Sequence, residues 1–70
     1  MKYAVVYEKT PRNYSAYVPD LPGCVATGST RDQVERRIRE AIELHVEELR
    51  RERQHVPQPS AWTETVEVPA

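Results

Sequence analysis

The 70-residue chain is poor in the features that usually stabilise a small domain. It has one cysteine, so no disulfide can form within it, and one cysteine with two histidines makes a poor set of metal ligands. A chain of this length buries only about 60% of the surface that its unfolded form exposes, so its own core is marginal. We therefore expect one domain, residues 1–70, that associates with itself as a dimer or tetramer, or with a permanent partner.

The chain also lacks a charge imbalance and a long apolar run. Ten basic and 11 acidic residues leave a formal net charge of −1, whereas nucleic-acid-binding domains usually carry a clearly basic surface. No apolar run approaches the roughly 20 residues that a membrane span needs. The first six residues, MKYAVV, are too short and too soon polar for a signal peptide. We expect a cytoplasmic protein with no membrane association.

Two apolar segments near the N-terminus predict a β-hairpin. Residues 3–7 (YAVVY) and 14–18 (YSAYV) are rich in strand-forming residues, and the polar segment between them contains Pro11 and Asn13. The first segment is apolar on both of its faces, which is typical of a strand that is shielded on both sides. Nothing else in the chain is long enough to cover the second face. We expect another polypeptide to cover it.

Both glycines of the chain lie in one stretch, residues 17–30 (YVPDLPGCVATGST). Pro19 and Pro22 cannot donate to a strand ladder, so pairing should stop there. Pro22 and Gly23 form a favourable turn pair. Residues 24–27 then predict a short third strand that ends at Gly28. We interpret this stretch as a corner between strands and not as an active-site loop.

A helix follows this corner. Thr30 and Gln33 fit the capping box, in which each side chain bonds the backbone amide of the other residue. Pro57 and Pro59 cannot continue a helix, so we expect it to fray near Arg53. The apolar positions that recur at helical spacing are Val34, Ile38, Ala41, Ile42, Val46 and Leu49.

The last segment, residues 61–68, predicts a strand with one solvent-exposed face, because Val66 and Val68 alternate with Thr65 and Glu67. The expected order is therefore β-β-β-α-β. This is an α+β fold, with a small antiparallel-rich sheet and one helix packed on one of its faces.

The residues that could carry chemistry have ordinary structural interpretations. His45 lies in the apolar stripe of the helix with no base, nucleophile or second ligand near it in the sequence. Cys24 has no partner that would lower its pKa, so we interpret it as a small buried side chain. The strands lack the converging carboxylates that two-metal cleavage of a phosphodiester needs. We expect no enzymatic activity, no metal and no cofactor.

The acidic residues allow two interpretations. Asp20 is well explained as a turn former between two prolines, whereas Glu40, Glu43 and Glu47 share one face of the helix. Such a face is usually a solvated one. The alternative is an acidic ridge that binds a basic partner.

The stretch from Val18 to Thr30 resembles the HicB-like antitoxin family. The matching elements are "PDLPG" at residues 19–23, "ATGST" at residues 26–30, "EAI" at residues 40–42 and the proline pair at 57 and 59. The resemblance covers nearly the whole chain. It implies a truncated ribonuclease-H-like sheet, homo-oligomers, and a partner toxin of the HicA type that cleaves mRNA.

Two features depart from the family pattern. Many members carry a C-terminal DNA-binding segment, but this chain ends two residues beyond the predicted last strand, so operator-DNA binding is not expected from it. Many members also place a glycine after the helix, whereas this chain has Arg53, Gln54 and His55 there. We expect the helix to run on or to end without a left-handed cap.

The leading hypothesis is an antitoxin that occludes the RNA-binding or active surface of a HicA-like mRNA interferase. An orphan homo-oligomeric module that binds a protein or a ligand and has no toxin is the alternative. A basic, RNA-binding toxin would be attracted to acidic residues. The residues expected to bind it are Tyr17, Asp20, Glu40, Glu43 and Glu47.

Overall fold

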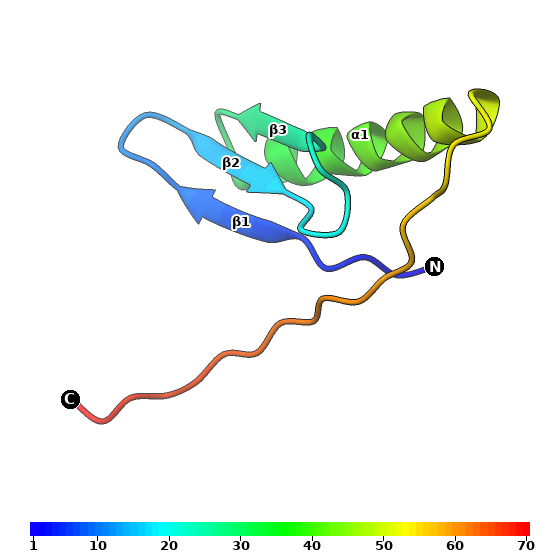
Figure 1. Ribbon diagram of the computed structural model, residues 1–70. Helices are drawn as coiled ribbons and strands as arrows, with labels where there is room; N and C mark the ends of the chain where they lie inside the picture. Colours follow the sequence, from blue (N-terminus) through cyan, green and yellow to red (C-terminus); the bar gives the residue numbers. More distant parts are fainter.

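A computed structural model describes all 70 residues and has a three-stranded sheet with one helix against it (Figure 1). The strands are β1 (Val6–Lys9), β2 (Tyr14–Tyr17) and β3 (Val25–Gly28), and the helix is α1 (Arg31–Arg51). The sheet is antiparallel with the order β1-β2-β3. The predicted α+β class, the hairpin, the third strand and the helix are confirmed.

The strand ladder is shorter at one end than the sequence predicts. Val6 pairs with Tyr17, and no residue before Val6 belongs to the ladder. The Val18 amide instead donates to the Cys24 carbonyl at 3.2 Å, and the next residue, Pro19, has no amide hydrogen. Residues 3–5 therefore find no strand partner, although the sequence predicted them as strand.

The core lies between the helix and the two strands β2 and β3. It consists of six buried residues, with Leu21, Val34 and Ile38 the largest of those that are fully enclosed. Leu21 comes from the corner between β2 and β3, so this turn contributes to the core as well as reversing the chain. The other three core residues are Ala16, Val18 and Cys24.

The helix leaves strand β1 uncovered. It packs against β2 and β3 but not against β1. Tyr7 of β1 pairs with Ala16 and therefore faces the helix side of the sheet. Its side chain is nevertheless 45% exposed. One helix is too narrow to cover three strands, so the β1 edge remains open.

The far face of the sheet carries one apolar row and one polar row. The strand register places Val6, Tyr17 and Val25 side by side, and it places Glu8, Ser15 and Thr27 in the next row. Tyr17 and Val25 are exposed. The apolar row agrees with the prediction that β1 has apolar residues on both faces, and the far face is uncovered in the single chain.

The N-terminus of α1 has the predicted capping box. The Gln33 amide donates to the Thr30 hydroxyl at 3.1 Å. The Gln33 side-chain oxygen accepts from the amide of Ser29 at 2.7 Å, one residue before the expected position. Asp32 lies in the first turn, where its charge complements the helix dipole.

The C-terminus of α1 differs from the prediction, because the helix ends with a left-handed cap. Arg53 has a φ of 56°. Its amide donates to the Arg50 carbonyl, and the Gln54 amide donates to the Leu49 carbonyl at 2.8 Å. These two bonds form the Schellman motif. An arginine thus occupies a position that glycine fills more easily, and the expectation that such a cap would be absent is wrong.

The predicted fourth strand is absent from the single chain. Residues 54–70, which we call the C-terminal arm, contain no regular secondary structure. The arm extends away from the body in Figure 1. The radius of gyration is 13.8 Å, whereas about 11 Å is usual for a compact domain of this length. The strand does not form here because residues 61–68 have no neighbouring strand to pair with.

Gly28 allows the helix to approach the sheet closely, and Gly28→Ala should destabilise the fold. A Cβ atom at residue 28 would lie 2.7 Å from the Val34 amide nitrogen and 3.1 Å from its Cα. Because these are backbone atoms of the helix, they cannot rotate away. We expect a loss of about 1–3 kcal/mol in the free energy of unfolding, measured with urea. The neighbouring, exposed Thr27→Ala should cost less than about 1 kcal/mol, and equal losses would contradict this explanation.

Arg53→Gly should stabilise the protein, which is unusual for a glycine substitution. The left-handed conformation costs a non-glycine residue about 1–2 kcal/mol, and part of this is regained when glycine replaces it. We expect a gain of about 0.5–1 kcal/mol in the free energy of unfolding, at a fixed protein concentration. Arg50→Gly, inside the helix, should lose about 1 kcal/mol. A loss in both variants would contradict the role of the cap.

Candidate protein-binding surfaces

The three glutamates predicted to form an acidic ridge lie on the outward side of α1. Glu40, Glu43 and Glu47 are all exposed. Leu44 lies among them, because residues three and four positions apart are neighbours on a helix surface. Its side chain is 66% exposed. We call Glu40, Glu43, Leu44 and Glu47 the helix ridge.

One end of the helix ridge is partly neutralised. The Arg51 guanidinium donates to Glu47 and to Glu48, at 3.0 Å in both cases. Because these groups are well exposed, the ion pairs contribute little to stability. They can be broken at small cost, so the Glu47 carboxylate remains available to a stronger cationic partner.

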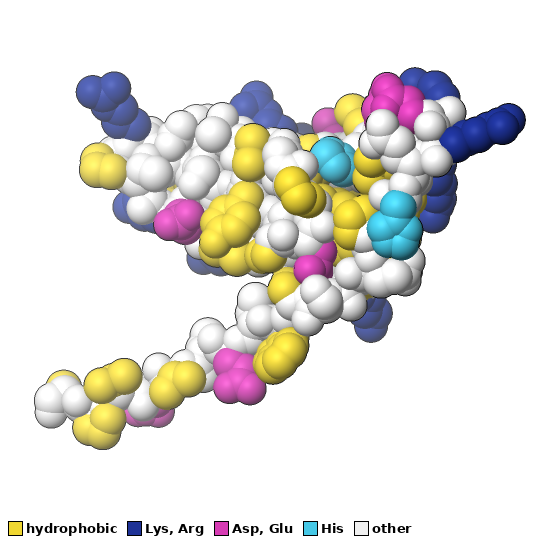
Figure 2. All heavy atoms as spheres, viewed as in Figure 1, with side chains coloured by type: hydrophobic (Ala, Val, Ile, Leu, Met, Phe, Trp, Pro, Cys, Tyr) yellow, Lys and Arg dark blue, Asp and Glu magenta, His cyan; other side chains and the backbone are white.

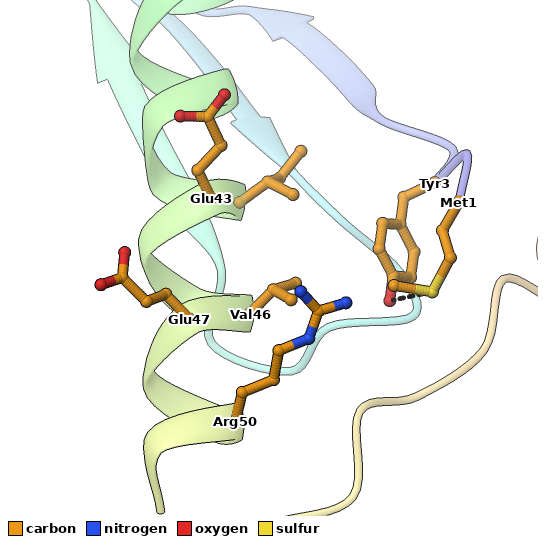
Figure 3. A pocket seen from close by; sticks show the side chains of 7 residues that line it. Met1, Tyr3, Glu43, Val46, Glu47 and Arg50 are labelled. Carbon is orange, nitrogen blue, oxygen red and sulfur yellow. Dashed lines mark hydrogen bonds between the residues drawn. The ribbon is translucent and has the colours of Figure 1, made fainter.

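An open groove of about 450 Å³ lies between α1 and the N-terminal segment (Figure 3). Val46 and Arg50 point from the helix towards Tyr3 and Met1, whereas the carboxylates of Glu43 and Glu47 point away from them. The Tyr3 hydroxyl donates to the Pro57 carbonyl at 2.6 Å, which holds the arm at this end of the body. Four apolar side chains line the groove together with Glu43, Glu47 and Arg50, so two residues of the helix ridge also border it.

Asp20 holds the C-terminal arm. Its carboxylate accepts from the Ser60 amide at 3.0 Å, the Ser60 hydroxyl at 2.7 Å and the Ala61 amide at 3.1 Å. These hydrogen bonds, the Ser60 amide first, hold the pKa of Asp20 below its ordinary value. The bonds connect residues 40 positions apart. Asp20 therefore links the corner before β3 to the arm.

The five residues predicted to bind a toxin do not form one surface. Tyr17 alternates with the buried Ala16 and so lies on the far face of the sheet, away from the helix. The Asp20 carboxylate is occupied by the arm. The other three belong to the helix ridge.

The side chains that could act as a nucleophile, a base or a metal ligand have the environments of structural residues. Cys24 is buried, and desolvation raises the pKa of its thiol, which disfavours the nucleophilic thiolate. His45 is half-buried on α1. No three acidic, histidine or cysteine residues lie close enough together to hold a metal ion. The helix is not long and apolar enough to cross a membrane.

Two features of these surfaces were not predicted from the sequence. Leu44 is not among the apolar positions predicted to face the core, and it is among the most exposed large apolar residues of the body. The sequence indicated Asp20 only as a turn former. Its contact with the arm joins residues 40 positions apart, so the local pattern does not indicate it. Neither could be found from spacing along the chain.

The structure is that of a small α+β domain whose surface carries exposed apolar and acidic side chains. The chain belongs to the HicB-like antitoxin family, because the family model described as "HicB_like antitoxin of bacterial toxin-antitoxin system" matches residues 3–70. The resemblance drawn from residues 18–30 is thereby confirmed.

Several curated relatives carry the name UPF0150 protein. The chain is 36% identical to one from Thermoplasma acidophilum over 67 residues, which cover 94% of this chain and 97% of the relative. It is 43% identical to one from Synechocystis over 56 residues, covering 79% and 71%. It is 44% identical to one from Archaeoglobus fulgidus over 48 residues, covering 67% and 70%.

The hydrogen bonds to Asp20 predict how its titration changes with sequence. In the native protein its carboxyl should titrate below about 3.9, the ordinary value for aspartate. Ser60→Ala removes one hydrogen-bond donor and should raise the pKa towards that value, as followed by side-chain NMR. Ser29→Ala, a matched change that does not touch Asp20, should leave it unmoved.

The lowered pKa of Asp20 also determines how the stability of the arm contact depends on pH. Because the folded pKa is lowered, the contact stabilises the native arm above the unfolded pKa and is lost as the pH falls through the folded value. The protection of the Ser60 and Ala61 amides from exchange, relative to an unfolded chain at the same pH, should then fall. An Asp20 pKa at or above its ordinary value would contradict the hydrogen bonds between its carboxylate and the arm.

Proposed function

We propose that this protein is the antitoxin of a HicA-like mRNA interferase and that it acts by binding the toxin and covering its RNA-binding or active surface. Membership of the HicB-like antitoxin family is the observation that carries the proposal. In this proposal the protein inhibits by stoichiometric binding and catalyses no reaction. Its residues act through contact and charge alone.

The helix ridge is the part of the molecule best suited to the toxin. A protein that binds RNA neutralises phosphates with lysine and arginine, so its binding surface is basic. The exposed Glu40, Glu43 and Glu47 present carboxylates to such a surface, and Leu44 supplies an apolar contact between them. Complementary charge accelerates association and fixes orientation.

The other two predicted contacts have weaker support. Tyr17 lies with Val6 and Val25 in the apolar row of the far face. It would contact the toxin only if the toxin also covered the far face of the sheet. Asp20 already bonds the arm, so its part in toxin binding would be to position the arm.

Reversal of charge on the helix ridge tests the proposal. The toxin to test is the product of a HicA-like open reading frame beside the gene, expressed with and without this protein. Wild type should restore growth and form a complex on gel filtration. Glu40→Lys/Glu47→Lys should weaken binding at least tenfold, because like charges would face each other in the complex.

The control variant is Glu8→Lys/Glu52→Lys. It makes the same change in net charge at two exposed glutamates outside the helix ridge, and it should bind within about threefold of wild type. If wild type neither forms a complex nor relieves toxicity, the protein is not the antitoxin of that toxin, and the orphan module is favoured. If both variants bind as wild type does, the helix ridge is not the toxin surface.

A further inference from the structure

The C-terminal arm has the pattern of a strand but no partner in its own chain. Trp62, Val66 and Val68 are 80%, 77% and 79% exposed. They share one face of an extended chain with Glu64, whereas Thr63, Thr65 and Glu67 share the other. Figure 2 shows apolar side chains spaced along the arm and separate from the body. Such a segment is stable in water only when its apolar face is covered.

The sheet has a matching free edge at β1. Strand β1 pairs only with β2, and no side chain hydrogen-bonds the backbone of Val6–Lys9. The opposite edge is partly blocked, because the Arg37 guanidinium donates to the Thr27 carbonyl of β3 at 3.0 Å. A free strand edge is a template for pairing with another strand. Strand β1 is therefore the more accessible edge.

We infer that the arm of one copy adds as a strand to the β1 edge of a second copy, and that the exchange is reciprocal. Each chain has an unpaired strand segment and an unpaired strand edge. Two copies can therefore pair the arm of each with the β1 edge of the other in a closed, two-fold arrangement. The fourth strand predicted from the sequence then forms between chains. The inference is independent of any toxin.

Length and charge favour this pairing. Residues 62–68 and residues 3–9 are both seven-residue segments, each about 23 Å long when extended. The arm segment carries Glu64 and Glu67 and no cation, whereas the β1 segment contains both Glu8 and Lys9 and is preceded by Lys2. The apolar side chains of the added strand would lie beside either the exposed Tyr7 or Val6, where they would extend the row of Val6, Tyr17 and Val25.

The hydrogen bonds at the base of the arm prepare it for exchange. Tyr3 holds Pro57, and Asp20 holds Ser60 and Ala61, so the chain is fixed up to the residue before Trp62. Only the strand itself has to be ordered when a second copy binds. This reduces the entropy that the association costs.

Two matched variants of the full chain test the exchange by light scattering across a range of concentrations. Val66→Asp/Val68→Asp places two charges on the apolar face, and Thr63→Asp/Thr65→Asp places two charges on the polar face of the same segment. The first should raise the dimer dissociation constant more than tenfold and the second less than threefold. Both should keep the native circular dichroism, because the arm contributes no residue to the buried core.

An NMR sample that mixes isotope-labelled and unlabelled copies identifies the contact directly. Methyl groups of Val66 and Val68 in one copy should show nuclear Overhauser effects to β1 protons of the other. A monomer at 500 µM (a concentration on the order of weak dimer affinities) would overturn the inference. So would a dimer that the first variant leaves intact, or methyl contacts to β1 within one chain only.

Discussion

One helix has to cover a three-stranded sheet, and it is wide enough for only two of the strands. The helix lies against β2 and β3 and leaves β1 open on the helix side, at its edge and on the far face. A domain of this size has little stability to spare. Exposed apolar groups beside an unpaired strand edge are therefore a liability unless another polypeptide covers them.

The uncovered strand β1 also bears on the arrangement of the C-terminal arm. Asp20 and Tyr3 fix its base against the body through side chain to backbone bonds, and the strand-like part beyond Ala61 remains free. The proposed inhibition by binding would need exposed surfaces of this kind. The proposed self-association uses the arm and the proposed toxin binding uses the helix ridge, so the two proposals are compatible with one complex.

Local signals account for what the sequence predicted well. Thr30 with Gln33 marks the helix start, and Pro22 with Gly23 marks the turn. Contacts between distant residues account for what it missed. The cap at Arg53 is an arginine in a conformation typical of glycine, so no local preference indicates it. Asp20 meets its partners 40 residues away. The predicted fourth strand is absent, because strand formation depends on a neighbouring strand and residues 61–68 have none in the single chain.

Amide hydrogen exchange of residues 62–68 measures most directly whether another polypeptide completes this domain. Strand amides that are paired exchange slowly, whereas those of a free extended segment exchange at the rate of an unfolded chain. The account predicts slow exchange of alternate arm amides and of the outward-facing β1 amides, with protection that rises with protein concentration. Rapid exchange of all of them at every concentration, in the protein alone and with its toxin, would contradict it.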